Sequence, residues 1–554
     1  MKISVNNTLV ELHTGARVKD AIVKYYSQKG KDIPKPLPAV GDRYGNTVDS
    51  DGELTEGNTL VIKDVHKKSS SLPVLVVAVL ASLILFSFSA GKRSTVTKGD
   101  GRQAVILSVN DMHAAVDNFP KLAYLVDSLR ALYPDMLLVS AGDNQTGNPV
   151  NDQSPEKGLP MIELMNAVGF NLSAVGNHEF DCHPEGFSYL THKADFDFIC
   201  ANFTADDSLN MKVSPYKIIT LPNGLRLAFF GLLYLNQNGI PDTHPDNTKG
   251  FTFRSPAETA KEYLYLKKQS DILIALTHYG FENDVQLAET LPAGIDLIIG
   301  GHSHTRVDKE QVHNGILITQ AENKLKYGTL IKLTVTDDGK IQRSAQLISI
   351  RDLKNEKASV RAMVDKFNDN PTLNKVIATA TDDFSSYDEL GYLMADAQRD
   401  AAGADIALVN PGGVRIDRLP KGPVTVMNVF QLDPFGNELV VVRLTGEELR
   451  ALMFAAFPID DHQPLCVSGI TTKVKVGQDG NLTDVTLLTA CGEPLDMTKT
   501  YTVAMNNYMM QVYKYQHADP GHSLFITTAE ATIGYLKKTG NIRSYRGEKR
   551  VEVN

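Results

Sequence analysis

The sequence is poor in cysteine, has no excess of basic residues, and contains no internal repeat or low-complexity tract. Its four cysteines (Cys182, Cys200, Cys466 and Cys491) form no CxxC pair, which argues against a cysteine-only zinc site. Cys466 and Cys491 could pair in an oxidising compartment, and free buried thiols are the alternative. The formal net charge of −9 argues against a general nucleic-acid binder, because such proteins need basic surface to displace counterions.

The length and composition predict a globular protein of several domains. The chain has 554 residues, of which 42% are hydrophobic and 22% are charged. Domains usually hold roughly 100–200 residues, so about three units are expected.

One long apolar run stands out. Residues 72–90 read LPVLVVAVLASLILFSFSA and carry no charge. A helix of this length extends about 28 Å, close to the roughly 30 Å hydrocarbon core of a bilayer. Lys67 and Lys68 precede it and Lys92 and Arg93 follow it, so flanking charge hardly favours one orientation. We predict an uncleaved, single-pass transmembrane helix, with a cytoplasmic N-terminal domain and a larger C-terminal part in the periplasm or outside the cell. A buried core helix is the alternative.

Residues 1–66 are predicted to form a small domain of their own. A hairpin is expected over residues 2–12, turning at Asn6-Asn7, and a short helix over residues 18–27. Short strands separated by glycine and aspartate turns follow in residues 42–64. This order resembles the β-grasp, ubiquitin-like sulfur carriers. Those carriers end in a free Gly-Gly, whereas this chain continues, so we expect a cytosolic interaction domain instead.

The remaining chain divides into two larger domains. Residues 91–101 are typical of a flexible linker. Strand-like runs alternate with helical patterns over residues 102–350, which predicts an α/β domain. Charged residues with apolar positions at helical spacing predict a linker helix within residues 351–374. Residues 375–554 are predicted to form a second α+β domain.

Polar motifs follow five apolar runs of the first large domain. They are Asn110-Asp111-Met112-His113, Gly142-Asp143, Gly176-Asn177-His178-Glu179, Thr277-His278 and Gly301-His302-Ser303-His304. Ligand sites of α/β sheets gather beyond the carboxyl ends of the strands, so these motifs are expected to meet.

This set of residue types is suited to two divalent metal ions. Asp-x-His and His-x-His each place two ligands on one side of an extended segment. Two ions about 3.5–4 Å apart need a bridging carboxylate to offset their repulsion, and Asp143 is the candidate. Asn177 adds a neutral oxygen, and histidine nitrogens favour zinc, manganese or iron over magnesium.

The motif order DMH, GDN, GNHEFD, THYG and GGHSH resembles the calcineurin-like metallophosphoesterases, and within them the 5′-nucleotidase and UDP-sugar hydrolase branch. The resemblance implies a four-layer α/β/β/α domain followed by a 5′-nucleotidase C-terminal domain. It also implies that one metal is held by Asp111, His113, Asp143 and His304, and the other by Asp143, Asn177, His278 and His302.

His178 and Asp181 are candidates for a catalytic dyad. They are three residues apart, within reach of one another on a helical turn. A carboxylate beside an imidazole raises its pKa and fixes its tautomer. His178 could then protonate the leaving oxygen while a metal-bound water attacks phosphorus. The resemblance implies the same roles. The alternatives are that His178 only supports the metal ligands and that Asp181 caps a helix.

Three segments of the C-terminal domain are similar to the nucleoside pocket of that family. They supply the candidate substrate-binding residues Asn410, Gly412, Gly413, Arg415, Phe435 and Tyr508. Arg415 offers a bidentate fork to phosphate, and a base could stack between the two rings. The chain departs from the family at Pro411, which replaces a glycine, and in lacking the Gly-Gly-Asp-Gly loop and an arginine before the helix that begins near Tyr387. Asp519 is a possible substitute for the loop that holds the ribose.

These residues predict a membrane-anchored, two-metal phosphohydrolase, 5′-nucleotidase-like, that hydrolyses a phosphomonoester of a nucleotide. The expected partner is a small-molecule phosphate ester and not a nucleic-acid polymer. The alternatives are a family member acting on cyclic nucleotides, nucleotide sugars or thiosulfonate-type esters, and a non-catalytic scaffold that kept the fold.

Overall fold

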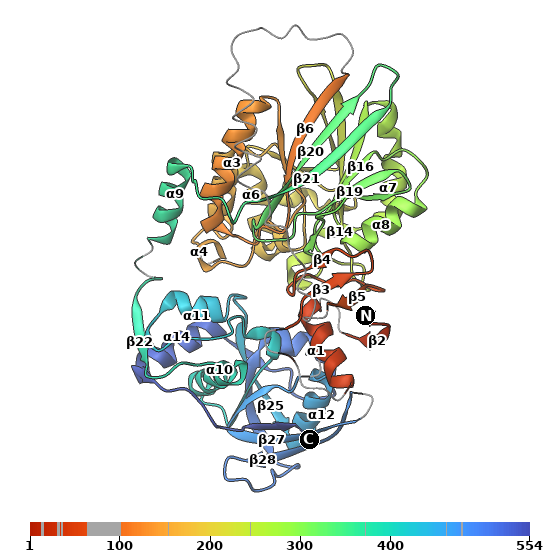
Figure 1. Ribbon diagram of the computed structural model, residues 1–554. Coiled ribbons are helices and arrows are strands. Elements are labelled where there is room, and N and C mark those ends of the chain that lie inside the picture. The colour runs from red at the N-terminus through yellow and green to blue at the C-terminus, as the bar shows by residue number, and fades with distance from the viewer. Residues whose placement is uncertain are drawn as a thin grey trace.

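The structure is a computed structural model. It describes residues 1–63 and 101–553, apart from residues 13–15, 30–33, 35, 36, 153, 244, 370, 372, 461, 462, 478 and 479. Three parts follow from the chain path in Figure 1: an N-terminal unit (residues 1–63), a sandwich domain (residues 102–350) and a C-terminal domain (residues 375–553).

Two sheets packed face to face form the centre of the sandwich domain. The strands of the first, in spatial order, are β11 (Val213–Ser214), β9 (Asp197–Ile199), β8 (Leu172–Ala174), β7 (Leu137–Ser140), β6 (Arg102–Val109), β20 (Tyr327–Val335) and β21 (Ile341–Ser349). Those of the second are β12 (Tyr216–Thr220), β13 (Arg226–Leu233), β15 (Ile272–His278), β16 (Leu297–Ile299), β19 (Ile316–Thr319) and β18 (Gln311–His313). A small pair, β10 (Phe203–Ala205) and β14 (Phe251–Phe253), lies beside them.

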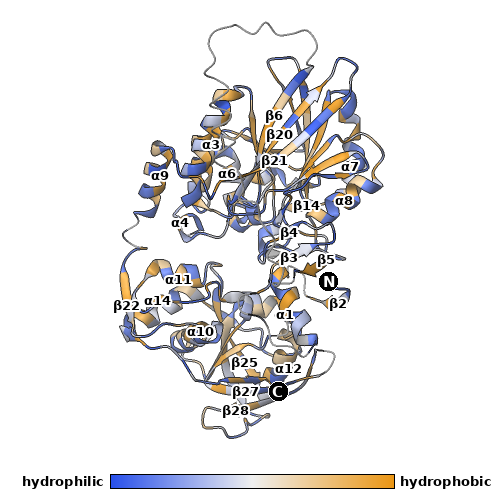
Figure 2. Ribbon diagram, viewed as in Figure 1, coloured by the Kyte–Doolittle hydropathy of each residue, from blue (hydrophilic) through white to orange (hydrophobic). Residues whose placement is uncertain are grey.

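Helices cover both outer faces, so the domain has the four-layer α/β/β/α arrangement. On one side lie α3 (Phe119–Leu132), α4 (Pro149–Asp152), α5 (Leu159–Val168) and α6 (His183–Lys193), and on the other α7 (Pro256–Tyr263) and α8 (Phe281–Thr290). Strand alternation explains the layers. Phe229 of β13 packs in the core between the two sheets, whereas the next residue, Phe230, packs in the core under α7 and α8. Figure 2 shows the hydrophobic residues concentrated along these strands.

The predicted linker helix exists but does not stand free. It is α9 (Ala358–Asn368), and Val360 and Val364 are buried in the same core as α3. The helix therefore belongs to the packing of the sandwich domain, and the apolar positions that predicted a helix are the ones that anchor it.

Over its described residues, the C-terminal domain combines three sheets with five helices. Its strands are β22 (Val376–Ala380), β23 (Ile406–Val409), β24 (Gly422–Thr425), β25 (Glu438–Thr445), β26 (Cys466–Ser468), β27 (Ile470–Val476), β28 (Leu482–Thr489), β29 (Thr500–Asn506), β30 (His522–Thr527), β31 (Asn541–Ile542) and β32 (Val551–Val553). Its helices are α10 (Tyr387–Ala402), α11 (Val426–Leu432), α12 (Gly446–Ala456), α13 (Asn507–Val512) and α14 (Thr528–Thr539). Capping boxes such as Thr445 with Glu448 begin several of them.

The N-terminal unit has the predicted order of two strands, a helix and further strands. These are β1 (Lys2–Val5), β2 (Thr8–Glu11), α1 (Val18–Gln28), β3 (Val40–Asp42), β4 (Thr47–Val48) and β5 (Thr59–Ile62). β1 pairs with β2 antiparallel and with β5 parallel. At the other edge, β4 pairs with β17 (Thr305–Arg306) of the sandwich domain, so one sheet is shared by the two parts.

This docking corrects the expectation that the N-terminal unit and the rest lie on opposite faces of a membrane, because a shared sheet requires both parts on the same side. The predicted span at residues 72–90 falls outside the described residues. No helix among the residues that the structure describes is long and apolar enough to cross a bilayer. The four cysteines are free; Cys466 is buried and Cys491 exposed, so the pair considered from the sequence does not form.

Candidate metal centre

The five predicted motifs meet at one place, beyond the carboxyl ends of β6, β7, β8, β15 and β16. Five of their residues have positive φ angles: Asp111 (48°), His113 (45°), Asp143 (52°), His302 (79°) and His304 (52°). Left-handed backbone is costly for such side chains and persists only where the surroundings enforce it, which is typical of functional sites.

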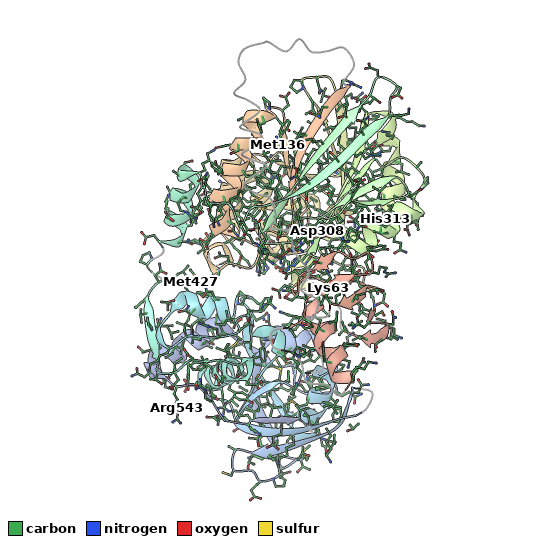
Figure 3. All side chains as sticks on the ribbon, viewed as in Figure 1. Lys63, Met136, Asp308, His313, Met427 and Arg543 are labelled. Atoms are coloured by element: carbon green, nitrogen blue, oxygen red, sulfur yellow. The ribbon has the colours of Figure 1, made fainter. Side chains whose placement is uncertain are left out.

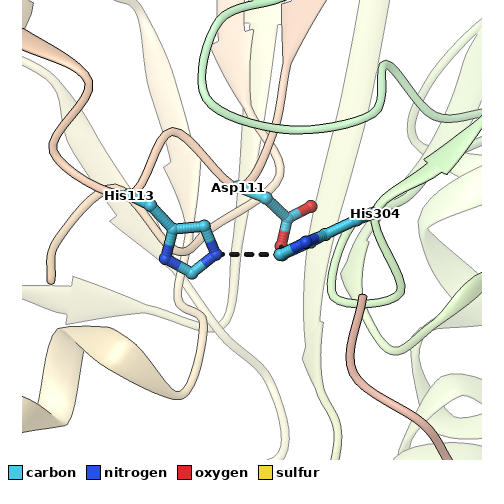
Figure 4. Close-up of side chains that lie close together, drawn as sticks. All are labelled: Asp111, His113 and His304. Carbon is cyan, nitrogen blue, oxygen red and sulfur yellow. Dashed lines mark hydrogen bonds and ion pairs between the residues drawn. The ribbon is translucent and has the colours of Figure 1, made fainter. Parts of the chain in front are cut away.

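Asp111, His113 and His304 form one half of the centre (Figure 4). The two imidazoles face one another, with 2.9 Å between their Nε2 atoms. Asp111 Oδ1 lies 3.4 Å from His304 Nε2. Asp143 Oδ2 lies 3.9 Å from His113 Nε2, so the Asp143 carboxylate borders this half.

Asp143, Asn177, His278 and His302 form the other half. Asp143 Oδ2 lies 3.1 Å from His278 Nε2. Asn177 Oδ1 lies 3.2 Å from both His278 Nε2 and His302 Nδ1. Asp143 therefore lies between the two halves, as expected of a bridge.

The donor set fits two bound cations. His113 Nδ1–H donates to the Thr146 carbonyl at 3.2 Å and His278 Nδ1–H to the Ala141 carbonyl at 2.8 Å, which leaves each Nε2 lone pair directed inward. Asp111 and Asp143 are almost completely buried. Buried carboxylates are normally paired or coordinate metals, and among the described residues these two carboxylates lie in groups with histidines that could hold an ion.

Two glycines allow the ligands to approach so closely. A Cβ on Gly176 would overlap Asp143 Oδ1, and a Cβ on Gly301 would lie 2.7 Å from the Ala141 carbonyl oxygen. Both motifs therefore need glycine for space and not for an unusual φ angle.

The His178–Asp181 pair has the geometry of a dyad. His178 Nδ1–H donates to Asp181 Oδ2 at 2.6 Å. Asp181 is held in turn by hydroxyl donors from Thr146 at 2.9 Å and Thr243 at 2.7 Å. Burial lowers the pKa of His178, but the carboxylates of Asp143 and Asp181 outweigh burial and hold it well above its ordinary value. Because Nδ1 is bonded to Asp181, the Nε2 atom of the ring is directed away from Asp181.

Sequence reasoning missed two supporting residues. Glu179 accepts hydrogen bonds from the backbone N–H groups of Asp143 (3.1 Å), Asn144 (2.8 Å) and Gly176 (2.6 Å), and so ties two motifs together. The side-chain amide of Asn323 lies 2.9 Å from His304 Nδ1, where it orients that ring. Glu179 stood inside a recognised motif, whereas Asn323 lies in a loop with no pattern.

A third missed residue comes from the N-terminal unit. Glu53 Oε1 lies 3.3 Å from His178 Nε2, and Oε2 lies 3.3 Å from His302 Nδ1 and 3.4 Å from Asn177 Nδ2. Glu53 is buried. It lies within residues 42–64, where the sequence predicted short strands separated by glycine and aspartate turns and no functional residue.

The candidate pocket residues of the C-terminal domain lie in one region. Asn506 Nδ2–H donates to Asn410 Oδ1 at 2.9 Å, which joins two of the three predicted segments. The Arg415 guanidinium lies 5.2 Å from the centre of the Phe435 ring, whose residue is 39% exposed. Burial and the neighbouring Arg17 lower the pKa of Arg415 to about 10. The Asp51 carboxylate raises this pKa but does not outweigh them. Tyr508 follows β29 on α13, beside the core of that domain.

Comparison with known families divides the chain at the same places. Residues 104–306 match the family "Calcineurin-like phosphoesterase", and residues 373–514 match "5'-nucleotidase, C-terminal domain". Neither match includes residues 1–103, so the β-grasp resemblance stays a prediction.

Similar proteins match more of the chain than either family alone. The chain is 29% identical to Protein UshA of Escherichia coli over 69% of this chain and 80% of that protein. It is 28% identical to Endonuclease YhcR of Bacillus subtilis over 81% of this chain, but spans only 41% of that longer protein.

A solved structure agrees with the fold. The 5'-nucleotidase precursor from Thermus thermophilus is 26% identical, with a TM-score of 0.66, and the match covers 82% of this chain and 99% of that one. Residues 104–306 are thus similar to calcineurin-like phosphoesterases and residues 373–514 to the C-terminal domain of 5′-nucleotidases, and the likeness to a solved 5'-nucleotidase precursor extends over most of the chain.

Proposed function

We propose that the protein hydrolyses a nucleoside phosphomonoester at a two-metal centre made of Asp111, His113, Asp143, Asn177, His278, His302 and His304. The observation that carries the proposal is the place of His178 beside these ligands. One carboxylate, that of Glu53, reaches both His178 Nε2 and His302 Nδ1 at 3.3 Å. A phosphate group bound in this position would contact both the candidate metal ligands and the candidate proton donor.

The residues of the chain then have distinct tasks. Asp143 would be shared by the two ions; Asp111, His113 and His304 would hold one of them, and Asn177, His278 and His302 the other. When bound, the two ions supply Lewis acidity to the phosphoryl group and lower the pKa of water. His178 Nε2–H donates its proton to the leaving ester oxygen, and Asp181 keeps the imidazole charged and in one orientation.

The C-terminal domain supports a nucleotide as the substrate. Arg415 lies close enough to Asp51 for their charges to interact, and Asp51 is two residues from Glu53, which borders the candidate metal ligands. Phe435, under Arg415, offers an exposed ring on which a base can stack. A nucleotide could thus place its phosphate at the metals and its base at this loop.

A metal and substrate panel tests the proposal. The full chain, loaded in turn with Zn²⁺, Mn²⁺ or Fe²⁺, is assayed with nucleoside 5′-monophosphates, cyclic nucleotides, nucleotide sugars and p-nitrophenyl phosphate. We expect hydrolysis of monophosphates that is lost in the Asp143→Asn variant. Preferential hydrolysis of a cyclic nucleotide or nucleotide sugar would replace the substrate assignment. No metal uptake and no hydrolysis of any ester would contradict the enzymatic function and favour a scaffold.

A further inference from the structure

An acidic loop of the N-terminal unit, Asp49-Ser50-Asp51-Gly52-Glu53, reaches the metal centre. Its Glu53 carboxylate lies between His178, the candidate proton donor, and His302 and Asn177, two candidate metal ligands. Glu53 is 5% exposed, so solvent does not separate the carboxylate from these side chains. A carboxylate of this kind is itself a ligand for divalent cations, and Glu53 and His302 belong to one group of side chains able to hold an ion.

Backbone contacts fix the loop in this position. The N–H of Glu53 donates to the His302 carbonyl at 3.4 Å, and the N–H of Asp49 donates to the His304 carbonyl at 3.3 Å. Val48 of β4 pairs with Thr305 of β17, the residue that follows His304. The same short segment thus supplies two candidate metal ligands and the edge to which the N-terminal unit binds.

Gly52 makes the close approach possible. A Cβ at this position would overlap the carbonyl oxygen of Ser303, between the two histidines. The overlapping atom belongs to the backbone and cannot rotate away, so an alanine would separate the loop from the metal centre.

Charges around the loop complement it. Lys326 Nζ lies 2.6 Å from Asp49 Oδ2, and Lys324 Nζ lies 3.8 Å from Asp51 Oδ2. Burial raises the pKa of Asp51, but Lys19, Arg17, Lys324 and Arg415 outweigh it, so the pKa lies well below its ordinary value. The cations include Arg415, one of the candidate substrate-binding residues. Asp51 and Glu53 therefore place two negative charges at positions that the anionic groups of a substrate would otherwise occupy.

The contacts extend to both larger domains. Arg43 forms an ion pair with Glu282 of α8 at 2.7 Å, and Lys24 Nζ donates to the Gly480 carbonyl of the C-terminal domain at 3.4 Å. Figure 1 shows the N-terminal unit between the two domains, and Figure 3 shows side chains filling its boundary with the sandwich domain near Lys63 and Asp308.

We propose that the N-terminal unit is a built-in occupant of the active site, in which Glu53 takes the place of the substrate phosphate and Asp51 that of a second anionic group. The inference rests on the proposed function, because it treats the metal centre as a phosphate site. The docked state excludes substrate, since one site cannot hold both carboxylate and phosphate. Hydrolysis then requires release of the loop, and the observed affinity for phosphate is reduced by the fraction of molecules that are docked.

Four full-length proteins test the proposal: the wild type, Gly52→Ala, Glu53→Gln and Glu56→Gln. Glu56 is the matched control, because it carries the same charge and also joins the N-terminal unit to the sandwich domain, but it is exposed and bonds to Gln237 and Lys2 instead of to candidate metal ligands. Each protein is loaded with Mn²⁺ and titrated with inorganic phosphate in a calorimeter. Hydrogen exchange of residues 47–53 and 302–306 reports docking directly, and p-nitrophenyl phosphate reports turnover.

We expect Gly52→Ala to speed exchange in both segments and to raise the phosphate affinity about tenfold, as for a wild type that is docked in roughly nine molecules of ten. Glu53→Gln should raise the affinity similarly while keeping the shape of the side chain, and Glu56→Gln should match the wild type. Rapid exchange in the wild type, or faster exchange in Gly52→Ala without tighter phosphate binding, would overturn the proposal. An equal gain in Glu56→Gln would do so too.

The two proposals fail separately. If phosphate binding and exchange change as expected but no protein hydrolyses any ester, the proposed function is wrong and the occupied site stands. If the esters are hydrolysed equally by all four proteins, the function stands and the inhibitory docking is wrong. Should Gly52→Ala fail to fold, as seen by circular dichroism, the isosteric Glu53→Gln variant decides by its phosphate affinity.

Discussion

The metal centre and the Asn410–Arg415 loop both follow the carboxyl ends of strands, but they are built differently. The metal centre draws ligands from five motifs and encloses them, so that even its glycines are fixed by close contacts. The loop after β23 depends on a few partners, and Phe435 beside it is exposed. A site enforced from many elements is rigid and suited to chemistry, whereas a site on one loop can change with the substrate. The following variants test that difference.

The largest effect is expected for Asp143→Asn. The amide keeps the shape but removes the negative charge that bridges both halves, so both ions should be lost and kcat/KM should fall by about a thousandfold or more, as for removal of a charged transition-state stabiliser. Metal content by mass spectrometry and kcat/KM measure it. The control is Asp338→Asn on the exposed turn between β20 and β21. Retention of two ions in Asp143→Asn would show that the bridge is elsewhere.

His178→Ala should keep both metals and lose turnover. Removal of a general acid typically lowers kcat by roughly 10²–10⁴-fold. The metal content is measured beside kcat, and His192→Ala on the outer face of α6 serves as the matched histidine control. Unchanged turnover in a metal-loaded His178→Ala protein would assign His178 to support of the ligands alone.

Gly176→Ala tests whether the centre is as tightly packed as its contacts indicate. The new methyl group would push against the Asp143 carboxylate, and we expect metal affinity to fall by about 10–100-fold, the range seen when the support of a ligand is disturbed. Gly186→Ala in α6 meets only one atom, 3.5 Å away, and should be neutral or slightly stabilising. Metal affinity is measured by titration. Equal affinities in the two variants would mean that the metal centre can rearrange to make room for the added methyl group.

The smallest effect is expected at the C-terminal loop. Arg415→Lys keeps the charge but loses the bidentate fork, so KM for a nucleoside monophosphate should rise about tenfold, equivalent to roughly 1.4 kcal/mol. KM for p-nitrophenyl phosphate, which has no nucleoside, should change less. Arg418→Lys on the exposed continuation of the loop is the control. An equal rise of KM for both substrates would place Arg415 at the reacting phosphate. The loop would then belong to the same site as the metal centre.

The sequence predicted what local patterns can encode. The motifs at the ends of β6, β7 and β15 predicted candidate metal ligands because each motif is contiguous in the sequence. The topology of parallel strands brings the ends of these strands together. The α/β class followed from strands that alternate with helices, whereas the four layers were implied by the resemblance to a known family. Neither Asn323 nor Thr243 had such a pattern, since each lies in a loop placed by tertiary packing.

Glu53 shows most clearly what the sequence patterns could not predict. Its role depends on the docking of one unit against another, and this contact rests on shape, on Gly52 and on the edge of β17, none of which a sequence pattern marks. The same docking corrected the expected separation of the N-terminal unit from the rest. The helix α9 was predicted correctly as a helix, but its anchoring against α3 depends on long-range packing in the same way.

The segment from His302 to Thr305 has a thermodynamic consequence. Its imidazoles face the other candidate metal ligands, while its backbone carbonyls accept hydrogen bonds from the N–H groups of Asp49 and Glu53. Any change in this segment alters both equilibria at once, so docking and metal loading are linked functions. By reciprocity, the factor by which metal changes the docking constant equals the factor by which docking changes metal affinity. If the N-terminal unit is released as proposed, the concentration of metal around the protein would set the fraction of molecules that are undocked.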